Sequence, residues 1–504
     1  MSRSLAGLPL EIISLIASSL SNRDIKTLRL TCRTLCNSVR LRLDRVFLSA
    51  NPLNIAVFLA IADSEKFQHG IKEIIWDDAR FLKSPYDEEE MHPEDQEELW
   101  KDDENGCPWW FAKQCEEQIE DLEMRSGSDR NHKEEEVLPL KICWQYYQNL
   151  LQQQEDVIIF NKDLDALVYG LPRFPALKRI TVTPAAHGWL FAPLYETPMI
   201  RSFPRGFNYP TPRGWPTIPD GTYKPKAKPW NDKSVKWDFR GFVLITRVLA
   251  TYPAHHISQL RISANTLETG LNCRIFEDKN QEYDDLASIM ARPGFKRLDL
   301  DLLVGGQEHT GWHAFRSRNL YHALTAARDL EYINLSTNTD CDPSSDSVQP
   351  GSGGSRAHLV PLQTIFPISS WTSLRHFGLR GLLVDQSNLI TFFASLPATL
   401  RSIHLSFLYF VDDGGSWQKL LQDMRTKLDW RTRDPESRPV VSVAVATDYQ
   451  QVGHAVWIDE DVAEFLYGEG PNPFYNGGDA VGCVGVVRDA FAPGKEWAKV
   501  PSGR

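Results

Sequence analysis

The sequence predicts an α/β fold in which three short helices at the N-terminus precede a long series of alternating strands and helices. Two observations predict it: an apolar stripe of helical period within the first 45 residues, and strand-like segments that recur after helix-like segments further on. With 504 residues, 42% of them apolar, the chain can bury an extensive core. The expected domains are residues 1–44 and 45–490, followed by a tail over 491–504.

The first predicted helix carries a single apolar stripe. Leu8, Ile12, Ile16 and Leu20 recur at every fourth position, which places them on one helical face. Pro9 suits the first turn of a helix, because its missing N–H would have no partner within the helix there. The segment therefore predicts one amphipathic helix near the start of the chain.

Two more short helices are predicted directly after the first. Residues 21–24 supply a helix stop followed by a new N-cap, after which Ile25 and Leu28 begin the second helix. Thr31 is expected to cap the third helix, which contains Leu35. Three helices within about 40 residues cannot bury all their apolar faces among themselves. Part of this surface is therefore expected to face a partner or the larger domain, which the unit would then cap.

The order of residues in this segment also carries a family resemblance. The residues that form the pattern are Leu8, Pro9, Glu11, Ile12, Ile13, Ile16, Leu20, Asp24, Ile25, Leu28, Arg29, Thr31, Cys32, Arg33 and Leu35. The pattern resembles the F-box, in the form common among filamentous-fungal F-box proteins. The resemblance implies docking on the Skp adaptor of an SCF cullin-RING ubiquitin ligase. It implies adaptor contacts at Leu8, Pro9, Ile12, Ile13, Ile16 and Leu20, with Ile25, Leu28 and Leu35 partly packing the motif itself.

Seven segments of the form apolar-x-x-apolar-x-apolar predict strands in the rest of the chain. They are residues 71–76, 177–182, 257–262, 295–300, 330–335, 374–379 and 400–405. At this apolar content the spacing occurs by chance about 35 times, so its alternation with helices carries the prediction. The predicted helices are residues 238–251, 283–290, 312–327 and 388–396. Such alternation is typical of a leucine-rich-repeat-like solenoid, although the units are irregular and lack the asparagine of the strict repeat.

The polar residues between the apolar strand positions define a candidate target-binding face. The strands alternate, so one face of the sheet is expected to be wet, and solenoids commonly bind partners in their concavity. The outward positions include Arg179, Thr181, Gln259, Asp301, Asn334, Ser402 and Ser406. The candidate substrate-binding residues are Arg261, Arg297, Asp299, Tyr332, His376, Arg380 and His404. A solvated sheet face without a ligand is the alternative interpretation.

Three insertions interrupt the predicted repeats. The first, residues 84–139, contains a block of 20 acidic and 5 basic residues over 87–136, and like charge favours a mobile, solvated excursion. The second, residues 193–236, is rich in proline and aromatic residues and predicts a lid packed on the surface, with a partner-binding motif as the alternative. The third, residues 339–358, has the composition of a flexible loop.

Composition and missing motifs argue against several function classes. The chain has 55 basic and 66 acidic residues and no lysine or arginine block, so neither nucleic acid nor a membrane surface is an expected partner. Its eight cysteines include no CxxC pair and are expected to be reduced. Neither a signal peptide nor a spanning segment is predicted, which favours the cytoplasm or nucleus. The common phosphate, acyl-transfer and zinc motifs are missing, so no catalytic residue, cofactor or metal is predicted.

These observations favour a non-catalytic substrate receptor. The F-box would bind the Skp adaptor, and through it cullin and RING subunits, while the repeat domain would hold an unknown protein target for ubiquitination. Two alternatives stay open. One is an F-box scaffold that acts outside a ligase, and the other is a metal-dependent enzyme that uses Asp299 and Asp301 as a DxD pair.

Overall fold

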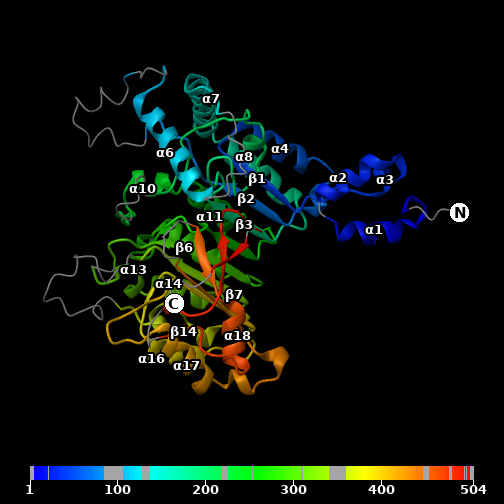
Figure 1. Ribbon diagram of the computed structural model, residues 1–504. Coiled ribbons are helices and arrows are strands. Elements are labelled where there is room, and N and C mark those ends of the chain that lie inside the picture. The colour runs from blue at the N-terminus through cyan, green and yellow to red at the C-terminus, as the bar shows by residue number, and fades with distance from the viewer. Residues whose placement is uncertain are drawn as a thin grey trace.

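A large, mostly parallel β-sheet forms the centre of this mixed α/β protein, with helices against it and three short helices projecting from one end (Figure 1). The structure is a computed structural model. It describes residues 5–20, 22–84, 101, 106–126, 137–217, 225–252, 254–307, 310–339, 359–446, 453–475, 480–492, 494 and 496–499. Within these ranges the main sheet has 13 strands.

The parallel strands lie in the sheet in the same order as in the chain. They are β1 (Arg45–Ser49), β2 (Glu73–Asp77), β3 (Arg179–Thr183), β4 (Gln259–Ile262), β6 (Arg297–Leu303), β7 (Tyr332–Thr337), β8 (His376–Arg380), β10 (Ser402–Ser406) and β12 (Val440–Val445). The two-residue strand β5 (Leu271–Asn272) extends β6 at one edge. Because each of the nine strands pairs with the one before it, the chain advances through the sheet in one direction.

All seven predicted strands are confirmed, and two further parallel strands flank them. β1 precedes the first predicted strand and pairs in parallel with β2, while β12 follows the last and pairs in parallel with β10. Residues 491–504 are not simply a tail, because Glu496–Lys499 forms β17. The antiparallel strands β13 (His454–Trp457), β16 (Gly485–Asp489) and β17 continue the sheet beyond β12.

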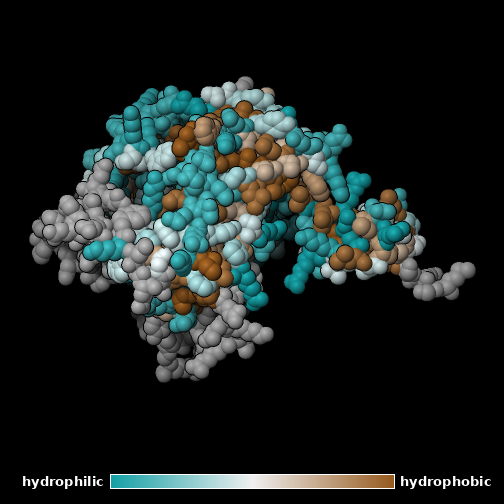
Figure 2. Space-filling model, turned by 90° about the horizontal axis from the view of Figure 1, so that it is seen from above, coloured by the Kyte–Doolittle hydropathy of each residue, from teal (hydrophilic) through white to brown (hydrophobic). Residues whose placement is uncertain are grey.

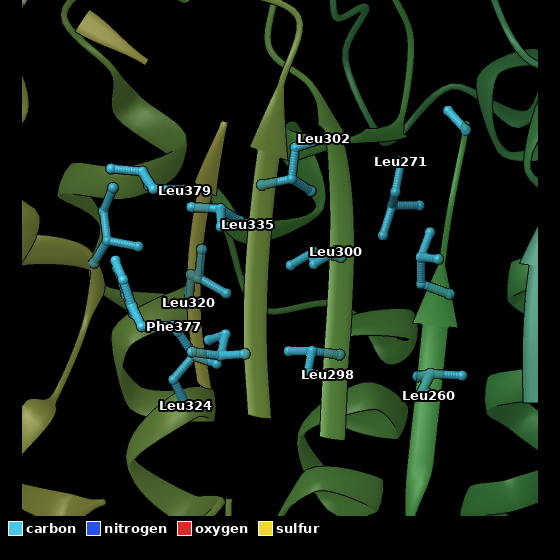
Figure 3. Close-up of a cluster of buried hydrophobic side chains, with 14 of the residues drawn as sticks. Leu260, Leu271, Leu298, Leu300, Leu302, Leu320, Leu324, Leu335, Phe377 and Leu379 are labelled. Atoms are coloured by element: carbon cyan, nitrogen blue, oxygen red, sulfur yellow. The ribbon is translucent and has the colours of Figure 1, made fainter. Parts of the chain in front are cut away.

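The core lies against one face of the parallel strands. Apolar side chains at alternate strand positions point to that face, and the aligned register stacks them into rows across the sheet. One row is Ile74, Ile180, Leu260, Leu298, Ile333, Phe377 and Ile403, all nearly inaccessible to solvent. Figure 3 shows part of this row, with Leu298, Leu300 and Leu302 following one another along β6. Helix α14 contributes Leu320 and Leu324 to the same cluster.

Helices that connect the strands cover this apolar face. They are α4 (Pro52–Ala62), α8 (Lys162–Gly170), α11 (Arg240–Thr251), α12 (Gln281–Met290), α13 (His313–Arg316), α14 (Asn319–Ala326), α15 (Leu362–Ile365), α16 (Gln386–Ala394), α17 (Trp417–Lys427) and α18 (Asp459–Tyr467). The helices predicted over 238–251, 283–290 and 388–396 are confirmed. The single helix predicted over 312–327 is wrong: Arg318 takes a left-handed conformation (φ 65°) that separates α13 from α14.

The first two insertions build a second, smaller core. Helix α6 (Trp109–Ser126) packs with α7 (Leu140–Ile159) and with residues 199–209, so the aromatic rings of Trp110, Tyr147 and Tyr209 are buried together. The mobile excursion expected for the acidic insertion is therefore wrong for α6, because its apolar side chains are buried here. The packing expected for the proline-rich insertion is confirmed where it is described. The expected loop over 339–358 lies outside the described residues, except for Thr339.

Short elements complete the description. They are the helices α9 (Pro198–Arg201) and α10 (Lys233–Asp238) and the two-residue strands β9 (Leu383–Val384), β11 (Tyr409–Phe410), β14 (Phe474–Tyr475) and β15 (Ala480–Val481).

Candidate functional site

The three N-terminal helices form a unit with its own small core. They are α1 (Leu10–Ser18), α2 (Asn22–Thr31) and α3 (Arg33–Ser38). The buried residues of this core are Ile13, Ala17, Ile25, Leu35 and Val39. This core is separate from that of the sheet, and Figure 1 shows the unit projecting away from the rest of the protein.

Helix boundaries in this unit differ from the prediction. The predicted first helix contained Leu8, Pro9 and Leu20, but α1 runs only from Leu10 to Ser18, with Pro9 at its N-cap. Thr31 was expected to cap the third helix, but it is the last residue of α2, where its hydroxyl donates to the carbonyl of Leu28 at 2.7 Å. Cys32 occupies the N-cap position of α3 and makes no side-chain capping bond. A threonine can bond back to its own helix as readily as it caps the next one, so the sequence did not distinguish these roles.

An apolar stripe on α1 remains uncovered. Ile12, Leu15 and Ile16 lie on α1 and are all exposed, Leu15 to 66%, and Leu8, two residues before the helix begins, is exposed as well. Figure 2 shows hydrophobic patches on the projecting unit, seen from above. An exposed apolar patch of this kind marks an interaction site, because water contact with it is unfavourable.

The structure divides the predicted adaptor contacts into two groups. Leu8, Pro9, Ile12 and Ile16 are exposed, whereas Ile13 is only 3% exposed and Leu20 packs against the unit's own core. Ile13 therefore offers no free face to a partner in this conformation, and Leu20 offers only part of its side chain. Leu10 and Leu15 are exposed instead, and the helical spacing of Leu15 from Leu8 and Ile12 was the signal that identifies it.

The second candidate surface is the polar face of the sheet, where side chains contact one another from strand to strand. At its β1 end, Glu73 lies 3.9 Å from the guanidinium groups of both Arg45 and Arg179 and accepts a hydrogen bond from the Thr181 hydroxyl at 2.7 Å. Arg179 in turn donates to the side-chain oxygen of Gln259 on β4 at 2.7 Å. Glu73 was not among the predicted site residues, although it lies between apolar positions of the first predicted strand.

A carboxylate between two arginines occupies the middle of this face. Arg297 donates to both oxygens of Asp299, at 2.6 and 3.0 Å, and the Nε of Arg261 lies 3.4 Å from the same carboxylate. The alternation of the strands brings these three predicted residues together, since Arg261 and Asp299 are register partners on β4 and β6. A bidentate guanidinium–carboxylate pair fixes both side chains in position.

Aromatic rings continue the contacts toward β10. The guanidinium of Arg297 lies 3.6 Å from the ring centre of Tyr332, and Tyr332 stacks on His376 at 3.9 Å with the two planes 6° apart. The Nδ1 of His376 lies 2.7 Å from the hydroxyl oxygen of Ser402. Arg297, Tyr332, His376 and Ser402 are successive register partners, so one row of the sheet holds a continuous stack.

His404 and Arg380 lie further along the strands. The Nε2 of His404 is 3.0 Å from the Ser406 hydroxyl, and its ring packs edge-on against Trp457 of β13. Arg380 lies over the ring of Phe407. Burial, together with the smaller effect of nearby positive charges, lowers the pKa of both His376 and His404 to about 4. Both imidazoles are therefore neutral near pH 7.

The predicted wet face is only partly solvated. Thr181, Asp299 and Ser406 are buried, because cross-strand partners and the packing of other segments exclude water from them. The guanidinium-bearing side chains of Arg45, Arg179, Arg261 and Arg297 keep between 23% and 47% of their surface exposed. The solvent-accessible part of the face therefore presents mainly arginine side chains, which donate hydrogen bonds.

The geometry of Asp299 and Asp301 does not favour a metal site. Both oxygens of Asp299 accept hydrogen bonds from Arg297, and Asp301 accepts one from the backbone N–H of Ala264 at 2.7 Å. Burial raises the pKa of Asp301 to about 6. In the described part of the chain, no cluster of three or more histidine, cysteine or carboxylate side chains has the arrangement of a metal site.

No protein-family model matches this chain, and a search of curated proteins finds no significant match. None of the described helices is both long enough and apolar enough to span a membrane.

Proposed function

We propose that the protein is the substrate receptor of an SCF-type cullin-RING ubiquitin ligase, with an F-box over residues 5–43 and a leucine-rich-repeat-like domain after it. The observation that carries the proposal is the uncovered apolar surface formed by Ile12 and Ile16 of α1 and by Leu8 just before the helix, within an F-box-like pattern. In this proposal the stripe docks on the Skp adaptor, which links the chain to cullin and RING subunits.

The packing of the N-terminal unit supports this role. Ile25 and Leu35 are buried and hold the three helices together, so the exposed residues of α1 are not needed for the unit's own core. A preformed helical surface avoids most of the ordering cost of binding, and buried apolar anchors supply most of the affinity at such interfaces. Pro9, exposed at the start of α1, belongs to the same surface.

The order of the strands supports a repeat domain. A parallel sheet whose strands follow chain order, with the connecting helices against one face, is how strand–helix repeats stack. The opposite face presents Arg261, Arg297, Tyr332 and His376 on rigid, mutually paired strands. Fixed donors and aromatic rings suit recognition of acidic and aromatic side chains on a protein target.

In the proposed mechanism this chain performs no chemistry. It raises the local concentration of target lysines near the ubiquitin-charged enzyme, and proximity accounts for the rate. The site residues therefore have binding roles: the α1 stripe for the adaptor, and Arg261, Arg297, Asp299, Tyr332, His376, Arg380 and His404 for the target. The proposed compartment is the cytoplasm or nucleus.

A reconstitution tests the ligase assignment against the scaffold alternative. The chain is co-expressed with Skp adaptor, cullin and RING subunits, and ubiquitin transfer to the chain itself is measured with activating and conjugating enzymes. A receptor is expected to assemble with the cullin and to become ubiquitinated in an adaptor-dependent manner. Adaptor binding without cullin recruitment or ubiquitin transfer would instead assign the protein to the scaffolds.

A further inference from the structure

A large cleft lies at the C-terminal ends of the parallel strands. Its volume is about 1180 Å³. Residues that follow the strands line one part of it, including Thr266 and Thr269 after β4, and Phe407 after β10. Helix α6 and residues 210–217 line another part. The cleft is thus formed where the first two insertions meet the ends of the strands, and the polar face of the sheet reaches it through Asp301 and Arg380.

Several buried polar atoms in the lining have no hydrogen-bond partner among the described residues. These atoms are Nη1 of Arg213, Nε1 of Trp189 and the hydroxyl oxygens of Thr266 and Thr269. Thr269 as a whole is only 5% exposed. Native proteins satisfy nearly all such buried groups, so their concentration in one cleft points to a bound group that completes them.

The chemistry of these atoms indicates what that group is. Arginine and tryptophan nitrogens can only donate hydrogen bonds, so the missing partner must accept them. Arg213 donates through Nη2 to the carbonyl of Gly188 at 2.7 Å, and among the described residues it forms no ion pair with a carboxylate. Burial, together with the nearby charge of Arg125, lowers the pKa of Arg213 to about 10.

The surroundings of Arg213 reinforce the demand for negative charge. Its guanidinium and that of Arg125 both lie over the ring of Trp189, at 5.2 and 3.6 Å from the ring centre. The two guanidinium charges repel each other beside one indole, although the nearby carboxylates of Asp121 and Asp489 stabilise the charge of Arg125. An anion beside the Arg213 guanidinium would offset this repulsion.

The rest of the lining limits the kind of anion. Apolar side chains of Leu82, Leu190, Trp215 and Leu267 border the cleft and favour a ligand with an apolar part. Carboxylates of α6, at Glu117, Glu120 and Asp121, also line it and would repel a polyanion.

We propose that the cleft binds a single anionic group, a phosphate or a carboxylate, that is attached to an apolar body. Arg213 and Trp189 donate to the anion, and the hydroxyl of Thr269 completes its contacts. The anionic group belongs either to a free small molecule or to a side chain of a bound target, because both present the same chemistry. This site does not depend on adaptor docking.

Titration calorimetry on the full chain tests the site with defined probes. Phenyl phosphate and phenylacetate are expected to bind saturably in the millimolar range or tighter. Neutral 2-phenylethanol and the polyanion tripolyphosphate are expected to bind at least about tenfold more weakly. No saturable binding of phenyl phosphate or phenylacetate, free or in a peptide, or equal binding of all four probes, would overturn the proposal.

Two variants connect the binding to the named atoms. Thr269→Val removes a hydroxyl that has no partner in the free protein, so the thermal midpoint is expected to stay the same or rise while phenyl phosphate affinity falls about fivefold. Arg213→Lys keeps the charge and a donor for Gly188 but loses the planar fork, and about a tenfold loss is expected. The matched control Arg328→Lys alters an exposed arginine outside the cleft and is expected to change nothing. Wild-type affinity in Thr269→Val and Arg213→Lys would contradict the assignment.

A peptide arm separates the two sources of the anion. A capped peptide with one phosphotyrosine between glycines is compared with free phenyl phosphate. Binding of the free probe at least as strong as the peptide supports a small-molecule ligand, and binding of the peptide alone supports a target side chain. Adaptor capture, measured on the same variants, is expected to be unchanged, so failure of this site and failure of the proposed function are distinguishable.

Discussion

The N-terminal unit and the sheet with its helices, which we propose is a repeat domain, differ in how they expose apolar residues. In the unit, Leu15 and Leu30 are 66% and 88% exposed, and the core contains only five buried residues. In the repeat domain, whole rows of strand residues such as Leu298 and Ile333 are inaccessible to solvent. A small unit cannot hide its apolar residues, so the difference indicates which part of the molecule gains most from an apolar partner.

The sheet also differs from the N-terminal unit in its polar residues, which are buried and paired with one another. On the sheet, Glu73 and Asp299 are buried between arginines, and Tyr332 stacks on His376. The repeat domain therefore offers a rigid, internally paired polar surface, which favours specificity through hydrogen bonds and charge. The comparison predicts two independent interactions of different chemistry on one chain.

The largest expected effect comes from the core of the repeat domain. Leu298→Ala removes a fully buried side chain from the middle row and should destabilise the domain by about 3 kcal/mol in urea unfolding. Val440→Ala, at an exposed position of β12, should change stability by less than about 0.5 kcal/mol. Capture of the Skp adaptor by Leu298→Ala should remain normal at low temperature. Loss of capture would show that the two regions are not independent.

A second pair of variants compares buried and exposed residues inside the N-terminal unit. Ile25→Ala should cost about 2 kcal/mol of local stability, because Ile25 has no exposed surface, and amide hydrogen exchange in α1–α3 should accelerate. Leu30→Ala, on the same helix, should leave exchange unchanged. Equal effects of the two changes would mean that the unit's core is not the one described.

The third prediction concerns the paired charges of the sheet. Arg297→Ala leaves the buried carboxylate of Asp299 without its bidentate partner and should cost about 2 kcal/mol of unfolding free energy. Lys296→Ala breaks the exposed pair with Glu331 on the neighbouring position and should cost less than about 1 kcal/mol. Chemical denaturation of both variants checks the difference. A larger loss of unfolding free energy in Lys296→Ala would contradict the role given to the Arg297–Asp299 pair.

The smallest expected effect depends on pH. Burial raises the pKa of Asp301 from 3.8 to about 6, despite the nearby charges of Arg380 and Arg261. Between these values the folded protein holds a proton that the unfolded chain has lost, so this group's contribution to stability falls as pH rises from about 4 to 6. Asp301→Asn removes the titration, and its thermal midpoint relative to wild type should rise by about 2 °C between pH 4 and pH 7.5. A constant difference across this range would refute the assignment.

The strands of the repeat domain could be predicted because their apolar residues alternate and recur. Two parallel strands, β1 and β12, were not predicted, and in each case the local sequence explains why. β1 follows the helical unit directly, and Leu43, which precedes the strand, falls within the expected N-terminal domain 1–44 although it packs on the main core. β12 has Arg438 where the pattern requires an apolar residue, and that arginine packs on the ring of Tyr467. The antiparallel strands β13, β16 and β17 are short and lack the repeat spacing.

The candidate sites were only partly predictable. Outward strand positions identified Arg297, Tyr332 and His376, but their stacking depends on register, which a single sequence does not contain. The cleft was not predictable, since it joins insertions whose packing is non-local. In the N-terminal unit, the pattern could not distinguish Ile13, which faces inward, from Ile12, which faces solvent.

The most direct test of the central claim is co-purification with the Skp adaptor, comparing wild type with the Pro9→Ala, Ile12→Ala double variant at equal expression. Ile159→Ala, which removes an exposed apolar residue at the end of α7, serves as the control. The account predicts capture by wild type and the control, at least about tenfold weaker capture by the double variant, and an unchanged thermal midpoint of the repeat domain. Equal capture of all three proteins, or capture of none, would contradict it.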